Sequence, residues 1–182
     1  NEFTLMPIDW APRYVGDEFS APEPSFIGNP INDVFFFKDR LGFLSGENVI
    51  FSRAADYFNF WPHTATDVVD GDPIDTKVAT DKVAILYHAV PFVNNLMLFS
   101  DQQQFSLSSG GGILTPKTVA ITPSTAFETA KNCRPVGSGP NLYFVVPSGE
   151  HSQVREYFVQ PNTVSNNAEN TTAHVPRYLP KN

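Results

Sequence analysis

Three segments of the chain repeat the same order of turns and apolar runs, and this internal period constrains the fold more than any other feature. In each segment an Asn follows a turn and opens an apolar strand, and a further turn leads to a strand with aromatic residues. These residues are Asn48, Asn95 and Asn141, which lie 47 and 46 positions apart. The spacing is close to the roughly 40–50 residues of one blade of a β-propeller.

A single meander of three or four strands cannot bury both of its faces. Meanders that stack face to face bury these surfaces against each other. We therefore predict an all-β fold built from propeller-like blades of antiparallel meanders. Because about four to eight blades usually close a propeller, about three repeats would form a partial or incomplete β-propeller, either as an arc or completed by further sequence. An ordinary β-sandwich whose strands only look periodic is the alternative.

Short apolar runs between turn residues give the positions of the expected strands. The 16 Phe and 16 Pro residues favour short strands over long helices. Val83–Val90 is a continuous apolar run suited to burial on both faces, and Tyr57–Trp61 alternates, with Phe58 and Phe60 on one face. Thr125–Lys131 could form one or two helical turns at most. The other predicted strands are Val34–Lys38, Leu41–Leu44, Val49–Ser52, Gln104–Ser108, Thr118–Thr122, Leu142–Val146 and Val154–Val159.

Residues 1–30 differ from the rest because Pro interrupts them repeatedly, at positions 7, 12, 22, 24 and 30. Pro removes a backbone donor and restricts the residue before it, so long regular elements are not expected. We interpret this part as an extended, Pro-rich lead-in that lies on a neighbour, with a frayed terminus as the alternative. Residues 31–182 are then the propeller-like domain.

The net charge of −7 and the absence of any Lys or Arg run argue against a basic surface that grips phosphate. An acidic wall would instead repel DNA and let it slide. Cys133 is the only cysteine, so an intramolecular disulfide is impossible and a reducing assembly compartment is the simple interpretation. No stretch approaches 18 apolar residues, so no transmembrane helix is expected. The first residues contain no signal peptide and no initiator Met, which indicates processing or a cut from something longer.

From about residue 25 to the last residue, a series of motifs resembles one known family. The motifs occur in the family's order and are Asn32–Asn48, Asp56–Pro62, Asp72–Asp75, His88–Phe92, Leu98–Gln102, Leu114–Lys117, Arg134–Gly137 and Thr172–Pro176. Together they resemble the tail tubular protein B family, the nozzle proteins of podophages with short non-contractile tails. Family members are several times longer, so we expect an internal fragment whose end at Tyr178–Asn182 is a cut.

The resemblance implies a structural role in the tail of the virion. It implies a homohexameric nozzle ring below the gatekeeper ring of tail tubular protein A, with propeller domains around a central channel. Double-stranded DNA would pass through this channel during genome ejection, and tail fibres would dock on the outside. On this basis we predict that the chain is not an enzyme.

Residues that could carry chemistry show no pattern specific enough to predict a catalytic, cofactor or metal site. Cys133 lies near Lys131 and Arg134, which could lower a thiol pKa, but no Gly-x-Ser-x-Gly elbow exists. The histidines lack metal-ligand spacing, and His88 is expected at a core or strand-edge position; the four are His63, His88, His151 and His174.

Acidic residues leave two alternatives open. The run Asp67, Asp70, Asp72 and Asp75 could hold Ca²⁺, but it lacks the EF-hand pattern and also suits a turn in which Asp side chains bond nearby amides. A pair of carboxylates could serve a carbohydrate-active hydrolase that degrades capsule or cell wall, the alternative function. The candidates for that pair are Asp56, Asp72, Asp75, Asp101 and Glu128.

Three further features have structural interpretations. Ser108–Gly112 is not followed by Gly-Lys-Ser/Thr, so we predict an inter-strand turn and no phosphate loop. Asn170–Thr172 fits a glycosylation sequon that has no meaning without a signal peptide. Tyr57, Trp61 and Tyr157 lie opposite the presumed core positions, where they would stack between blades or fill a subunit interface.

Overall fold

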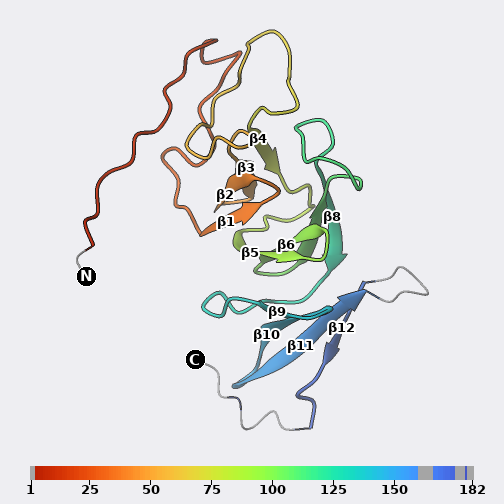
Figure 1. The fold of residues 1–182 in the computed structure, drawn as a ribbon. Coiled ribbons are helices and arrows are strands. Elements are labelled where there is room, and N and C mark those ends of the chain that lie inside the picture. The colour runs from red at the N-terminus through yellow and green to blue at the C-terminus, as the bar shows by residue number, and fades with distance from the viewer. Residues whose placement is uncertain (1–2, 160–165, 175–178, 180–182) are drawn as a thin grey trace.

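The computed structural model describes residues 3–159, 166–174 and 179, and within them it contains twelve strands and no helix. The strands form three antiparallel sheets of four, and each sheet is a meander that follows the chain. Figure 1 shows the three sheets one after another along the chain.

The first sheet contains β1 (Asp33–Phe37), β2 (Arg40–Ser45), β3 (Asn48–Phe51) and β4 (Ile74–Lys77). The second holds β5 (Leu86–Phe92), β6 (Asn95–Ser100), β7 (Gln104–Ser108) and β8 (Ala120–Thr125). The third holds β9 (Val136–Ser138), β10 (Asn141–Ser148), β11 (His151–Val159) and β12 (Asn166–Asn170). The prediction of an all-β fold of antiparallel meanders is confirmed.

The repeated Asn marks a two-residue hairpin. Asn48, Asn95 and Asn141 each pair with the residue three positions earlier, across the turn. This hairpin joins β2 to β3 in the first sheet, but the first and second strands in the other two sheets. The sequence repeat is therefore real as a hairpin, and its first copy is displaced by one strand relative to the sheets.

The first residue of each of these three turns has a positive φ, which suits the right-handed twist of the flanking strands. Gly occupies this position in two turns, Gly46 at φ 59° and Gly139 at φ 59°. In the middle sheet the position is held by Val93 at φ 55°, with a side chain that is 79 % exposed. A β-branched residue in this conformation is strained.

Replacing Val93 with Gly should therefore stabilise the fold by about 1 kcal/mol, because strain is removed and almost no burial is lost. Urea denaturation measures the change. The matched control is Gly139→Val, which should destabilise by a similar amount. A destabilised Val93→Gly variant would contradict the assignment of strain to this turn.

Most predicted strands are confirmed to within about three residues, and the segment Tyr57–Trp61 is the main error. It forms turns, because its polar groups bond locally: the backbone N of Asn59 donates to the carbonyl of Asp56, and its carbonyl accepts from the backbone N of Arg53. The Asn59 side chain also bonds Asp56 and the backbone N of Trp61. As a result Phe60 is buried, while Phe58 is 38 % exposed. Residues 125–131 contain no helical turn.

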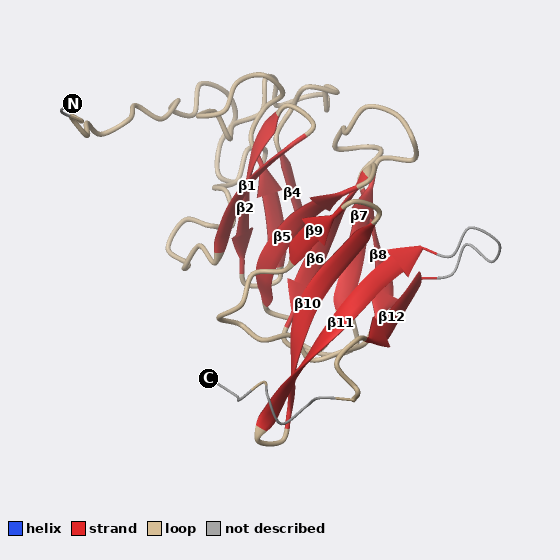
Figure 2. Cartoon of the chain, turned by 60° about the horizontal axis from the view of Figure 1, so that its bottom comes forward, coloured by secondary structure: helices blue, strands red, loops and turns tan. Residues whose placement is uncertain are grey.

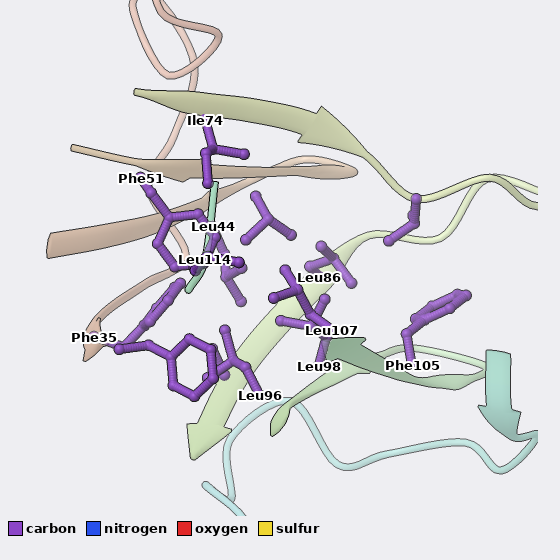
Figure 3. Packing of buried hydrophobic residues seen from close by; sticks show 14 of the residues in the cluster. Phe35, Leu44, Phe51, Ile74, Leu86, Leu96, Leu98, Phe105, Leu107 and Leu114 are labelled. Atoms are coloured by element: carbon purple, nitrogen blue, oxygen red, sulfur yellow. The ribbon is translucent and has the colours of Figure 1, made fainter. Parts of the chain in front are cut away.

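The middle sheet packs on both faces, and β6 shows this most clearly. Leu96 and Leu98 belong to the core shared with the first sheet, whereas Met97 and Phe99 belong to the core shared with the third. Figure 3 shows Phe35, Leu44, Phe51 and Ile74 of the first sheet facing Leu86, Leu96, Leu98 and Leu107 of the second. Burial on both faces was expected for Val83–Val90; within β5 Ala89 and Val90 confirm it, one in each core, whereas Val83 lies before the strand and is exposed.

Residues 3–32 contain no strand or helix, as the Pro content of the lead-in predicts. Part of the lead-in covers the outer face of the first sheet. Phe26 lies edge-on to Phe43 and Phe60 at ring distances of 5.1 Å and 5.1 Å, and Ala21 is buried. In Figure 1 the lead-in lies with the connection after β3 above the first sheet. The division into a lead-in of residues 1–30 and a domain of residues 31–182 stays a prediction. Val175, Pro176 and the end at residues 180–182 lie outside the described residues.

Candidate functional site

Arg40, at the start of β2, is fully buried and ties two long connections to the first sheet. Its Nη1 donates to the carbonyls of Ser52 (2.8 Å) and Asp72 (2.6 Å), and its Nη2 donates to those of Asp70 (2.8 Å) and Leu114 (3.2 Å). Burial lowers the pKa of the guanidinium, and the charges of Asp72 and Asp39 partly offset that effect. The connection after β3 and the connection after β7 thus depend on one side chain.

In the acidic run Asp67–Asp75, Asp72 follows a turn and Asp75 lies in β4, and both carboxylates accept hydrogen bonds within the fold. The buried carboxylate of Asp72 accepts from the backbone N of His63 and of Val69, both at 2.8 Å. Asp75 accepts from the backbone N of Ser25 at 2.8 Å and from Asn48 Nδ2 at 3.0 Å. Among the described residues no group of three or more His, Cys, Asp or Glu side chains could hold a metal ion. The interpretation as a turn is confirmed for Asp72.

Asp33, Ala89 and Arg134 form a polar clasp that joins the first and second sheets to the segment before the third sheet. Arg134 Nη1 lies 2.5 Å from Asp33 Oδ1, and its Nη2 donates to the carbonyl of Ala89 at 2.9 Å. The backbone N of Ala89 donates to Asp33 Oδ2 at 2.8 Å. The clasp therefore connects β1, β5 and the segment that leads into β9.

His88 lies beside this clasp, at the strand-edge position that its sequence context predicts. Its Nε2 lies 3.0 Å from the carbonyl of Lys131. Burial lowers the pKa of His88 below its ordinary value of 6.5; the bond to Lys131 and the charge of Asp33 oppose this shift, and Arg134 adds to it.

The lowered pKa of His88 predicts how the stability of the folded chain changes with pH. The unfolded chain binds the His88 proton more readily than the folded chain, so stability falls as the pH drops through the unfolded value near 6.5. Urea midpoints measured between about pH 5 and pH 7.5 should rise with pH in this window. A His88→Asn variant should show a flatter profile. An equal slope in both chains would remove His88 as the cause.

A cavity of about 680 Å³ opens at one end of the middle sheet, and both apolar and neutral polar side chains line it. They include Asn95, Ser106, Thr122 and Tyr157. Lys38 reaches the rim, where its Nζ donates to Ser109 Oγ (2.5 Å) and to the carbonyl of Gly112 (3.1 Å). No acidic residue lines the cavity. The arrangement can hydrogen-bond a ligand but offers no nucleophile with an adjacent base.

Several of the remaining candidates have structural roles. Ser108–Gly112 is the predicted turn, with Ser109 Oγ donating to the carbonyl of Gly112 at 2.8 Å. Cys133 is exposed. Tyr157 packs between the second and third sheets, edge-on to Phe92 at 5.7 Å, and Ser124 bonds its hydroxyl at 2.8 Å. Tyr57 packs on Phe36 at 5.4 Å, and Trp61 lies under the Arg13 guanidinium at 5.4 Å.

The geometry is that of three packed sheets joined by buried polar contacts. The chain matches the family model described as bacteriophage nozzle protein over residues 1–182. The chain belongs to the bacteriophage nozzle protein family. It is 47 % identical over 179 residues to tail tubular protein gp12 of Escherichia phage T7. The alignment covers 98 % of this chain and 22 % of the relative, so the chain spans about a fifth of that protein's length.

Membership in this family confirms the resemblance that the sequence motifs indicated. The nozzle chain is a structural component of a bacteriophage tail and is located in the virion. In the part of the chain that the structure describes, no helix is long and apolar enough to cross a membrane.

Proposed function

We propose that the chain forms part of the wall of a nozzle ring through which phage DNA leaves the virion. The observation that carries this proposal is the stack of three meanders, in which the middle sheet is packed on both faces and buried polar groups fix the connections. Such a stack resists deformation, because closely packed interiors have low compressibility. A rigid wall suits a channel that must stay open during genome ejection.

The stack is propeller-like in this proposal. Each meander runs in chain order, and β5, the first strand of the second meander, contacts β1 and β2 of the first and β9 of the third. The first strands thus lie along one side of the stack, as they do around a propeller axis. On the third sheet, Tyr143 and Val145 are half-buried on the outer face, which Figure 2 shows without a described element in front of it. A further meander of a longer protein would cover this face.

The ring would contain six copies and lie below the gatekeeper ring of tail tubular protein A, with tail fibres docked outside. Each chain has a net charge of −7. This charge supports the passage of double-stranded DNA, because an acidic wall does not bind phosphate. The lead-in of residues 1–30 and the propeller-like domain of residues 31–182 would both belong to this wall, with part of the lead-in packed on the first sheet.

The role is structural and not enzymatic in this proposal, and three of the five candidate carboxylates support it over a carbohydrate-active hydrolase. Asp72 and Asp75 each use both oxygens in hydrogen bonds within the fold. Asp56 Oδ2 accepts from Asn59. A general acid or nucleophile needs a carboxylate that faces substrate.

Gold-labelled antibodies raised against this chain provide a direct test on intact virions. They should decorate the tail below the capsid in electron micrographs. In parallel, incubation of the chain with capsular polysaccharide should release no reducing ends above the level of a heat-inactivated sample. Label confined to fibre tips, or release that an Asp→Asn change stops, would favour the hydrolase.

A further inference from the structure

A hollow of about 330 Å³ opens between the lead-in and the connection after β3, and every residue that lines it is apolar. Its walls include both tryptophans of the chain, Trp10 and Trp61. The walls are preformed: Trp10 lies edge-on to Phe58 at 5.5 Å, and the backbone N of Ala11 donates to the carbonyl of Phe58 at 3.0 Å. We call this feature the aromatic hollow.

Residues 3–8, which we call the arm, leave the fold at the rim of this hollow. Phe3, Leu5 and Met6 are 91 %, 97 % and 81 % exposed. Among the described residues, the first hydrogen bond along the chain is made by Ala11. Figures 1 and 2 show the arm running away from the sheets. Several exposed apolar side chains close together mark an interaction segment.

We propose that the arm of one copy of this chain docks in the aromatic hollow of a second copy. The two features match in chemistry, because neither the arm nor the lining of the hollow contains a charged residue. A saccharide needs several polar groups to orient it, whereas beyond the backbone the lining residues have only the indole N–H groups of Trp10 and Trp61. The volume is at the lower end of ligand pockets and suits a few apolar side chains.

The position of the arm makes the exchange intermolecular. The arm ends two residues before Trp10, which is itself a wall of the hollow, and it points outward from there. Six extended residues span about 20 Å, far enough to reach an adjacent molecule. Since each copy gives an arm and receives one, the contact is head-to-tail, and such contacts close into rings when the rotation allows. The inference goes beyond the proposed nozzle role and does not depend on DNA passage or on fibre docking.

Two charge substitutions test the exchange by sedimentation. Leu5→Asp puts a charge on the arm, and Phe58→Asp puts one in the wall of the hollow. The wild-type chain should associate as its concentration rises, and each variant alone should bind at least about tenfold more weakly. An equimolar mixture should form dimers and stop there, because the Phe58→Asp copy still supplies an arm and the Leu5→Asp copy still supplies a hollow.

Tryptophan emission gives a second readout, since both tryptophans line the hollow. A peptide of residues 1–9 should shift this emission to shorter wavelength in the wild-type chain and not in Phe58→Asp. Leu5→Asp cannot disturb the fold, because Leu5 is 97 % exposed, so the test stands even if Phe58→Asp unfolds. A wild-type chain that stays monomeric at millimolar concentration, a Leu5→Asp chain that associates like the wild type, or a peptide without effect would each overturn the proposal.

Discussion

Replacing Arg40 with Met should destabilise the chain by about 3–5 kcal/mol, a large part of the stability of an ordinary domain. The substitution keeps the volume of the side chain but removes donors from four carbonyls, those of Ser52, Asp70, Asp72 and Leu114. Buried acceptors without a partner cost about 1–3 kcal/mol each when water cannot reach them. Urea denaturation followed by circular dichroism measures the loss.

Two controls separate this network from the effect of losing any arginine. Arg13→Met removes one 3.2 Å bond to the carbonyl of Ala21 and the contact of the guanidinium with Trp61, and it should cost no more than about 1–2 kcal/mol. Arg40→Lys keeps the charge but not the planar guanidinium, so it should recover only part of the loss. A loss below about 1 kcal/mol for Arg40→Met would show that the two connections hold without it.

Replacing Phe99 with Ala should cost about 3–5 kcal/mol, because a fully buried ring is removed from the core between the second and third sheets. Its neighbour Leu98 faces the core shared with the first sheet, and Leu98→Ala should cost about 2–5 kcal/mol. The exposed control is Val136→Ala, at a side chain that is 62 % exposed, which should change stability by less than about 0.5 kcal/mol.

The two core variants should differ in where they loosen the fold. Amide hydrogen exchange should rise most in β10 and β11 for Phe99→Ala, and most in β2 and β3 for Leu98→Ala. This opposite pattern follows from the alternation of side chains along β6, which puts successive residues on opposite faces. An identical exchange pattern in both variants would contradict the arrangement of a middle sheet packed on both faces.

Much of the fold could be predicted because most of the strands carry strong local signals. Apolar runs identified strands such as β5 and β10, and the Asn repeat identified one hairpin in every sheet. Three outer strands gave no signal. Of these, β4 has one apolar residue, β9 has three residues including a Gly, and β12 is polar apart from Ala168. Each of these strands forms because the adjacent strand of its sheet offers unpaired backbone groups. The sequence of the strand itself does not show that such a partner exists.

The polar ties could not be predicted for a related reason. Arg134 meets Asp33 across 101 positions, and Arg40 meets Leu114 across 74. No short-range pattern distinguishes these arginines from solvated ones. Only a resemblance to known proteins could indicate the function, because stacking meanders is compatible with many roles and function depends on the site rather than the fold.

The central claim, that this stack of meanders forms part of the wall of a tail channel, is tested most directly by cryo-electron microscopy of the virion that carries the chain. The map should show the three four-stranded sheets in a ring around the DNA channel, with the outer face of β9–β12 covered by a further meander of the same protein. Density for this sequence on a fibre, or in an isolated domain outside the ring, would contradict the account.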